Sequence, residues 1–573
     1  MRSSISSTSI VCQPFDQSYQ GGIGSPREMV FSIIPIHSWI CGFLVTTILA
    51  QWADPGLTQV ALGANNACEA GSVQRPELDG IHIISLTAAE QLNFTYSPHP
   101  RFRFGRAIHG LNFCNITVIY THPGWNDEIE VTTFLPMENW NGRFQGNGGG
   151  GWVTGGIEVG GITMMPSLEA GFAVSTTDGG HSSKLDDASG DVMSWAFTSP
   201  GNINWPLFLD FSHVALHDMA MIGKALTEAF YGTPPKYSYF YGGSTGGRQA
   251  YMLAQRYPSD FDGILGFCPA INWDKFQWSP LWAHRVMDKT GVYPRPCEFE
   301  AITAAAMKAC DGLDGVEDGI ISMPSRCFFN ASTLVSQAFD CGGKDALFTP
   351  EAAEAANAAW NGPRSVAGEF QWYGYGRDAK MWQFGALHTS CNGEGEKCAP
   401  VRLSIAESYA RYFVAKNANL DLQALGHSQW DDLFVASRNE YESITGTSDP
   451  DLSRFRKAGG KLLSWHGMAD QIIPVNGTVD YTDRVLKKDP KAHDYFRMFL
   501  AAGADHSISN GLAPRNTLSA LIDWVEKGIA PVTLRVEGLN AYGKHMTRDI
   551  CMYPQVQHYV GGDPALPSSF ACV

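Results

Sequence analysis

The chain has 573 residues, of which 44% are hydrophobic and only 17% are charged. This length exceeds that of an ordinary single domain, so we expect a globular protein with a large core and more than one domain, and dominant disorder is excluded. The formal net charge is −16, from 41 basic and 57 acidic residues, and no run of Lys or Arg is longer than a pair. Nucleic acid and anionic membrane surfaces are therefore poor candidates for partners.

The N-terminal segment is strongly apolar. Residues 29–50 are nearly free of charge and are followed by a polar, turn-prone stretch. We interpret residues 1–53 as a secretory signal segment cleaved near Ala50 or Ala53, with Met29 as an alternative start of translation. An uncleaved anchor is the competing interpretation, because 22 mostly apolar residues could span a bilayer. We favour cleavage and no stable membrane association, since the most apolar part covers only about a dozen residues.

Two further patterns favour an oxidising, secretory environment. N-x-[ST] sequons predict a glycoprotein. Several of the 13 Cys residues have a partner nearby in the sequence, and no C-x-x-C metal motif occurs. Scattered reduced cysteines in a cytosolic protein are the alternative. The sequons lie at Asn93, Asn115, Asn330 and Asn476, and short-range disulfides are expected at Cys310–Cys327, Cys391–Cys398 and Cys551–Cys572.

From about residue 110 onward, short β-branched runs alternate with segments that keep helical spacing. The runs are bounded by Pro, Asn or Gly, which is typical of strands. The order strand, helix, strand, tight Gly turn, helix predicts an α/β fold built on a parallel sheet. The expected strands cover residues 116–120, 129–135, 171–175 and 237–241, and the expected helices cover 207–230 and 248–256.

The tight Gly turn carries a G-x-S-x-G motif centred on Ser244, between a predicted strand and a predicted helix. Such a turn lifts a Ser hydroxyl off the sheet edge, and Gly242 and Gly246 let the strand and the helix approach each other. The amide of Thr245, at the helix start, would face a developing oxyanion. The motif therefore predicts a nucleophile, with an ordinary loop Ser as the alternative.

A nucleophilic Ser needs an acid and a base, which follow it in that order in this kind of fold. Asp470 comes after a predicted strand at 461–467, and His506 comes after one at 496–500. Both lie beyond strand C-termini, where the sites of open α/β sheets form. We expect His506 to take the proton of Ser244 and Asp470 to orient His506. The competing residues are His466, Asp505, His181 and His217.

A Gly-rich run at residues 144–152 follows the early strands. Because only Gly lets the backbone approach a substrate carbonyl closely, we expect Gly148 or Gly149 to supply a second oxyanion amide. A flexible turn is the alternative. The run is not a phosphate loop, since no Gly-Lys-Ser/Thr follows.

An acidic loop lies between the candidate nucleophile and acid, bracketed by Cys310 and Cys327. Clustered oxygen ligands on a loop closed by a disulfide suit Ca²⁺, although the spacing of the carboxylates is not that of an EF-hand. A solvated acidic turn is the alternative. The candidate ligands are the side chains of Asp311, Asp314 and Asp318 and the carbonyl groups of Val316 and Ile320.

Several motifs together resemble the tannase and feruloyl esterase family: residues 242–249, 261–264, 175–181 and 467–474 and the Asp311 loop. The resemblance covers about residues 60 to 573. It implies an α/β-hydrolase domain (54–271 and 460–573) with a large lid (272–459) inserted between nucleophile and acid. It also implies the triad Ser244, Asp470 and His506, structural Ca²⁺ in the acidic loop and a Cys68–Cys114 disulfide. Cys268, Cys297 and Cys341 remain, so at least one thiol is free or pairs unexpectedly.

One departure from the family pattern concerns the active site. The family usually joins a Cys just before the Ser to a Cys just after the His by a disulfide, whereas this chain has Gly243 and Ser507 there. Our hypothesis is that packing and the hydrogen bond between Ser244 and His506 hold the geometry instead, so that catalysis is intact but the two loops are easier to separate.

The sequence as a whole predicts a secreted serine carboxylic-ester hydrolase acting on a small-molecule aromatic ester of hydroxycinnamoyl or galloyl type. The alternatives are an esterase or depside-type hydrolase of secondary metabolism, a catalytically silent binding homologue, and a peptidase or lipase on the same fold. Whether the chain forms a homodimer stays open. Six aromatic side chains of the lid are candidates for stacking on a phenolic ring of the substrate. The alternative is that they pack the core of the lid itself. They are Trp360, Phe370, Trp372, Tyr373, Tyr375 and Trp382.

Overall fold

The computed structural model describes residues 67–100, 105–190, 192–393, 397–506 and 511–573. The predicted signal segment at residues 1–53, with Cys12 and Cys41, lies outside the described residues. The described parts of the predicted hydrolase domain and lid belong to one compact unit. No described helix is both long enough and apolar enough to cross a bilayer.

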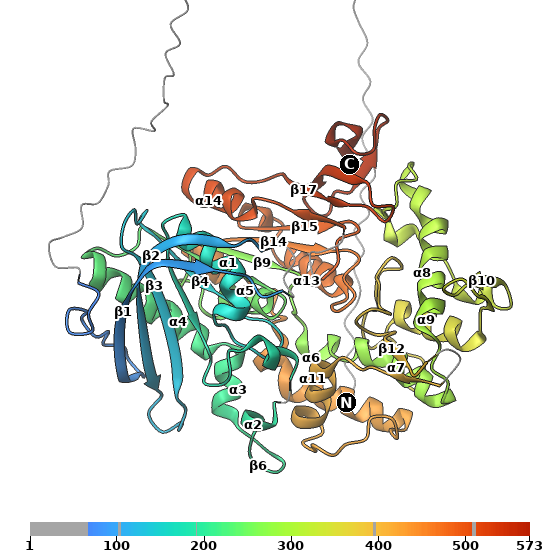
Figure 1. The fold of residues 1–573 in the computed structure, drawn as a ribbon, viewed down its shortest axis with the longest axis horizontal. Helices are drawn as coiled ribbons and strands as arrows, with labels where there is room; N and C mark the ends of the chain where they lie inside the picture. Colours follow the sequence, from blue (N-terminus) through green and yellow to red (C-terminus); the bar gives the residue numbers. More distant parts are fainter. Residues whose placement is uncertain (1–66, 101–104, 191, 394–396, 507–510) are drawn as a thin grey trace, which may run out of the picture. The chain divides into compact units, whose positions relative to one another are not determined.

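A mixed sheet of nine strands forms the centre of the described chain, in the spatial order β1-β2-β3-β5-β4-β8-β9-β14-β15 (Figure 1). From β5 to β15 all neighbours are parallel, as predicted. At the other edge β1, β2, β3 and β5 pair antiparallel, which the sequence analysis did not foresee. The strands are β1 (His82–Tyr96), β2 (Ile108–Thr121), β3 (Ile129–Pro136), β4 (Arg143–Asn147), β5 (Ala173–Thr177), β8 (Tyr237–Gly243), β9 (Gly263–Phe267), β14 (Lys461–Gly467) and β15 (Phe496–Ala501).

Helices cover both faces of this sheet, so its parallel strands are buried on both sides. One face packs against α4 (Val214–Tyr231), α5 (Thr245–Arg256) and α13 (Val475–Lys488), through residues such as Met219, Leu253 and Val485. The other packs against α1 (Ile157–Glu169) and α14 (Thr517–Lys527), through residues such as Met164 and Trp524. This arrangement leaves the carboxyl ends of β8, β14 and β15 free to carry a site.

The predicted helix at 207–230 is two helices, α3 (Trp205–Ser212) and α4, separated at His213. The buried guanidinium of Arg248 donates hydrogen bonds to the carbonyl oxygens of Phe211 and Ser212, at 3.0 and 2.8 Å. These carbonyls therefore have partners outside the helix, which allows α3 to end there.

The region predicted as a lid consists of helices joined by long loops, and it joins the core of the sheet domain through aromatic side chains. Trp152 donates a hydrogen bond to Ser408 (2.8 Å) and its ring lies 5.0 Å from that of Phe413. The helices are α6 (Trp273–Phe276), α7 (Ser279–Thr290), α8 (Pro296–Cys310), α9 (Pro350–Asn361), α10 (Ser404–Ser408), α11 (His427–Tyr441) and α12 (Ser453–Ala458), with the short strands β10 (Ala338–Asp340), β11 (Asp345–Leu347), β12 (Thr389–Cys391) and β13 (Cys398–Pro400).

Smaller elements complete the described chain. Three C-terminal strands form their own antiparallel sheet, and two further pairs of short strands form hairpin-like ladders. These elements are α2 (Met193–Ala196), β6 (Phe197–Ser199), β7 (Asn202–Ile203), β16 (Gly511–Pro514), β17 (Thr533–Leu539), β18 (His545–Cys551), β19 (Gln557–Tyr559) and β20 (Phe570–Cys572).

All four predicted disulfides are present, and a fifth joins Cys297 to Cys341. The two cysteines of the fifth are 44 residues apart, so short spacing could not reveal the pair. Cys268 is the one free cysteine among the described residues, and it is buried.

Candidate active site

Ser244 occupies the sharp turn between β8 and α5, as predicted. Its backbone adopts φ 58° and ψ −120°, a strained conformation for a residue with a side chain. The turn is tight, because a Cβ atom at Gly242 would lie 2.6 Å from the backbone of Gly246. The side-chain hydroxyl of Ser244 lies 3.0 Å from Nε2 of His506.

His506 follows β15 and lies between Ser244 and Asp470, which follows β14. Its Nδ1 is 2.8 Å from Oδ2 of Asp470. Because the ionised carboxylate only accepts, Nδ1 carries the hydrogen and Nε2 is left to accept from the hydroxyl of Ser244. The backbone N–H of His506 also donates to Oε1 of Gln471, at 3.1 Å. The structure therefore brings together the three residues that the sequence placed 226 and 36 residues apart.

Asp470 is 1% exposed and has four donors. The backbone N–H groups of Ile472 and Ile473 donate to Oδ1, both at 2.8 Å. Nε2 of His466 lies 3.0 Å from Oδ2, on which His506 also converges. His466 is fully buried, and its Nδ1 contacts the hydroxyl of Thr478. This competitor for the base is therefore a second partner of the acid, a role that chain order alone did not reveal.

The electrostatics of the site favour an ionised Asp470. Burial raises the pKa of a carboxyl group, but the charge on protonated His506 and the hydrogen bonds from both imidazoles outweigh it and hold the pKa of Asp470 well below its ordinary value. Burial lowers the pKa of His506, and the charge of Asp470 more than reverses this effect, so the pKa of His506 is raised. The pair is thus arranged to stabilise an imidazolium.

The two remaining histidine competitors are engaged elsewhere. Nε2 of His181 bonds the carbonyl of Trp152 (2.7 Å), and Nδ1 of His217 bonds Asp260 (2.8 Å). Asp505 is buried and contributes to the raised pKa of His506.

The two glycine amides expected to bind an oxyanion are already hydrogen-bonded within the protein. Gly148 and Gly149 both line the cavity beside Ser244. However, the N–H of Gly148 donates to the carbonyl of Tyr241 (3.2 Å), and that of Gly149 donates to Oε1 of Gln249 (3.1 Å). Neither amide is available in this structure. Thr245 is the first residue of α5, where an amide has no partner within the helix, and its hydroxyl donates to the carbonyl of Gly151 (2.7 Å).

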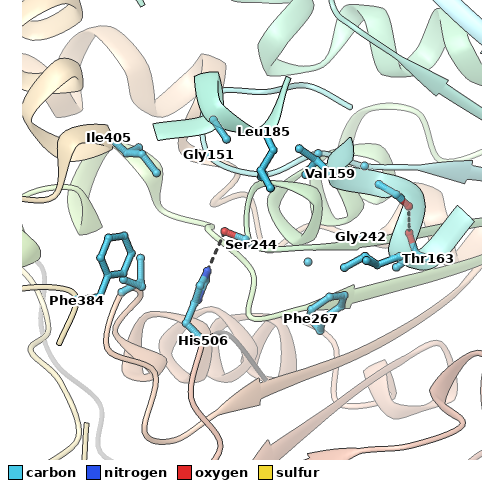
Figure 2. A pocket seen from close by; sticks show the side chains of 18 of the residues that line it. Gly151, Val159, Thr163, Leu185, Gly242, Ser244, Phe267, Phe384, Ile405 and His506 are labelled. Carbon is cyan, nitrogen blue, oxygen red and sulfur yellow. Dashed lines mark hydrogen bonds between the residues drawn. The ribbon is translucent and has the colours of Figure 1, made fainter. Parts of the chain in front are cut away.

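A cavity of about 280 Å³ opens beside Ser244 and His506 (Figure 2). Its wall is mainly aliphatic and glycine backbone, and Phe384, Leu403 and Ile405 of the lid region contribute to it. None of the six lid aromatics singled out in the sequence lines it. Four of them, Trp360, Trp372, Tyr375 and Trp382, are buried in core clusters, because large aromatic side chains fill an interior as readily as a binding site.

The acidic loop has buried carboxylates with unused oxygens. Oδ2 of Asp314 and Oδ1 of Asp318 are buried without a hydrogen-bond partner, which fits an oxygen-ligated cation. Asp311 accepts hydrogen bonds from the backbone N–H groups of residues 318, 319 and 320, and buried Arg548 pairs with the second oxygen of Asp318. Val316 and Ile320 belong to the same loop. The three carboxylates are not among the described side-chain groups whose ligand atoms all lie within 4.8 Å of one another.

The four sequons lie in different settings. Asn93, Asn330 and Asn476 are exposed. Asn115 lies within β2, is half-buried, and its Oδ1 is buried without a partner.

An aromatic ring lies where the family's loop-to-loop disulfide would begin. Phe267 is opposite Gly243 on the neighbouring strand, and a Cβ atom at Gly243 would lie 2.1 Å from its ring. The ring of Phe267 is held in place by a stacked Trp465, with centroids 5.3 Å apart. Ser507 lies outside the described residues. The space next to the nucleophile is thus packed, as the hypothesis requires on the Ser side.

The parallel sheet, the strained Ser turn and the acid and base at neighbouring strand ends define an α/β-hydrolase. A family profile described as tannase and feruloyl esterase matches residues 114–573. A probable feruloyl esterase of Arthroderma benhamiae is 38% identical over 89% of this chain and 94% of its own, and the tannase of Aspergillus oryzae is 27% identical over 81% and 85%. The solved tannin acyl hydrolase of Aspergillus niger is 25% identical over 88% of this chain and 94% of its own, with a TM-score of 0.77.

The chain therefore belongs to the tannase and feruloyl esterase family, and it is a carboxylic-ester hydrolase.

Packing of Phe267 against Gly243 predicts a steric penalty for any side chain at position 243. We expect Gly243→Ala to lower the free energy of unfolding by about 1–3 kcal/mol, because the new methyl group overpacks a filled site. In Gly243→Ala/Phe267→Ala the methyl group has room, so the double variant loses less than the sum of the single variants. Urea unfolding measures this, with Gly71→Ala, whose Cβ meets nothing within 4 Å, as the neutral control. Additive losses would contradict the packing account.

Proposed function

We propose that the protein is a secreted serine esterase that cleaves small aromatic esters through an acyl-enzyme. The observation that carries the proposal is the continuous chain of hydrogen bonds from Ser244 through His506 to Asp470, at the wall of an apolar cavity. In this assignment Ser244 is the nucleophile, His506 the general base and acid, and Asp470 the group that orients His506.

The reaction follows from the hydrogen-bond directions. Nε2 of His506 accepts the proton of Ser244 as its oxygen attacks the ester carbonyl, and the charge of Asp470 stabilises the imidazolium. The amide of Thr245, at the N-terminus of α5, donates to the oxyanion. His506 then gives its proton to the leaving alcohol, and it later removes a proton from the water that releases the acyl group.

The cavity supports an acyl group with few hydroxyls. Within the described lining, His506 is the only side chain that titrates, and the hydroxyl of Thr163 already donates to the carbonyl of Gly160 (2.9 Å). Each phenolic hydroxyl buried there without a partner would cost about 1–3 kcal/mol. We therefore expect hydroxycinnamoyl esters to be better substrates than galloyl esters, which carry three ring hydroxyls.

Secretion and calcium belong to the same proposal. The five disulfides support an oxidising compartment, and the exposed sequons Asn93, Asn330 and Asn476 support glycosylation there. We assign Ca²⁺ to the acidic loop, held by Asp311, Asp314 and Asp318 and the carbonyl groups of Val316 and Ile320. The ion would supply positive charge to buried carboxylates and act structurally.

Substitution of Ser244 tests the mechanism. We expect Ser244→Ala to lower kcat on methyl ferulate at least about 10⁴-fold, and rapid mixing of the native enzyme with an activated ester to show a burst of about one alcohol per enzyme. Hydrolysis that survives in Ser244→Ala would overturn the proposed nucleophile.

The same enzyme should show a rise of kcat/KM with pH, because only neutral His506 accepts a proton. The midpoint should lie above the ordinary value of 6.5, since Asp470 raises the pKa of His506. Asp470→Asn should shift the midpoint to lower pH and reduce kcat by about 10⁴-fold. His217→Gln, which alters a His–Asp pair outside the cavity, is the control and should leave the midpoint unchanged.

A substrate panel tests the acyl preference. We expect kcat/KM for methyl ferulate to exceed that for methyl gallate by about tenfold or more, with a long-chain triglyceride and a peptide not cleaved. Leu403→Asn, which adds a hydrogen-bonding group to the wall, should narrow the gap between ferulate and gallate. Val401→Asn, on the same segment but outside the lining, should not. A preference for gallate in the native enzyme would contradict the assigned acyl group.

Removal of calcium tests the acidic loop. A ligand present at about 100 times its Kd stabilises the folded state by about 2.7 kcal/mol, so a calcium chelator should lower Tm by several degrees. Asp314→Asn should lower Tm and abolish the response to Ca²⁺. Glu317→Gln, in the same loop but outside the ligand set, should keep the response of Tm to Ca²⁺. A chelator without effect on the native protein would refute the calcium assignment.

A further inference from the structure

A second group of ionisable side chains lies outside the esterase cavity, where β2 ends. His122 directly follows β2, Asp127 lies in the turn to β3, and Asp210 and Asp218 lie in α3 and α4. The fold brings these four side chains together from segments almost 100 residues apart, and none of them lines the cavity beside Ser244. The group has no part in the proposed esterase mechanism.

His122 is oriented as metal-binding histidines are. Its Nε2 lies 3.0 Å from Oδ2 of Asp218, which also accepts a hydrogen bond from the hydroxyl of Tyr120 at 2.9 Å. A carboxylate that accepts from one ring nitrogen fixes the tautomer and directs the electron pair of the other nitrogen toward a metal. The other ring nitrogen, Nδ1, is hydrogen-bonded to Oδ2 of Asp127, so it carries a hydrogen that a metal ion would displace on binding.

Two further carboxylates face this nitrogen. Oδ1 of Asp127 accepts from the hydroxyl of Thr121 (2.7 Å) and the backbone N–H of His122 (2.8 Å), which directs Oδ2 to within 2.6 Å of Nδ1. Asp210 is 0% exposed, and neither of its oxygens has a hydrogen-bond partner in the described structure. Its Oδ1 lies 4.0 Å from Nδ1. His122, Asp127 and Asp210 each offer one ligand atom, and these three atoms all lie within 4.8 Å of one another.

The protein supplies one positive charge to this group, that of His122, whose two ring nitrogens both bond to carboxylates. Three buried carboxylates surround one imidazole, and no salt bridge from Lys or Arg reaches any of them in the described part of the chain. Buried carboxylates without partners are costly, and they are found paired or bound to metal. A divalent cation at Nδ1, which binds with release of the His122 proton, would supply the remaining charge.

We propose that Nδ1 of His122, Oδ2 of Asp127 and Oδ1 of Asp210 bind a divalent transition-metal ion of the Zn²⁺ type. One imidazole with two carboxylates is a ligand set that such ions accept, whereas Ca²⁺ and Mg²⁺ prefer oxygen alone. The side chain of His122 is 11% exposed, which gives the ion a path from solvent. The site is structural: the ion ties the β2–β3 turn to α3, and Asp218 on α4 orients the histidine.

Cobalt substitution tests the site directly. The untagged, full-length mature protein is saturated with Ca²⁺ to fill the acidic loop and is then titrated with Co²⁺. Cys268→Ala serves as the background, because Cys268, Asp470 and His506 form the other described group that could hold a metal. We expect visible absorption bands that saturate at one Co²⁺ per chain and disappear on addition of Zn²⁺, together with a rise in Tm.

Variants of the ligands decide the assignment. Asp210→Asn should weaken binding by at least about tenfold, and Asp127→Asn should do the same if Asp210→Asn fails to fold. Asp260→Asn is the matched control, because Asp260 pairs with His217 of α4 and the pair belongs to no three-residue ligand group among the described residues. This variant should bind Co²⁺ as the background does. Absence of the bands in the background protein would show that a proton shared by His122 and Asp127 takes the place of the ion. Unchanged affinity in the ligand variants would equally overturn the proposal.

Discussion

The carboxylate of Asp470 is the anchor on which the candidate active site depends. Its four donors come from three places: the turn after β14, the end of β14 itself and the loop after β15. Because Asp470 is buried and carries a negative charge, loss of any donor would leave that charge less compensated. The carboxylate therefore fixes the loop that carries His506 relative to the sheet, and Nε2 of His506 is aimed at Ser244 as a consequence.

The wall of the cavity is positioned by a different kind of contact. Trp152, which closes the Gly-rich run, packs against Phe413 and bonds to Ser408, so the run beside Ser244 and the helical lid region share one aromatic core. Arg248 lies over Phe211 and Trp273 in the same cluster, 5.0 and 5.6 Å from their ring centroids. Lid residues such as Leu403 and Ile405 are thus part of a packed interior rather than of a loosely attached cover.

Local patterns predicted the parts of the site that depend on local geometry. The G-x-S-x-G turn and the strand-end positions of Asp470 and His506 follow from chain order and periodicity, and the structure brings these residues together as expected. Contacts between distant segments have no comparable pattern in the sequence. The pairing of Cys297 with Cys341, the second imidazole on Asp470, the partners of the Gly148 and Gly149 amides and the antiparallel edge of the sheet all depend on tertiary packing. Composition likewise could not separate buried lid aromatics from cavity residues.

The stack of Phe267 on Trp465 beside Gly243 has a consequence for how the enzyme matures. The family's usual link between the two catalytic loops requires an oxidation step, whereas here van der Waals contact fills the corresponding space next to Ser244. The remaining disulfides join other parts of the chain. Because the chain has Gly243 and Ser507 at the two positions, no oxidation step is needed to join these loops, and a reductant has no bond between them to break.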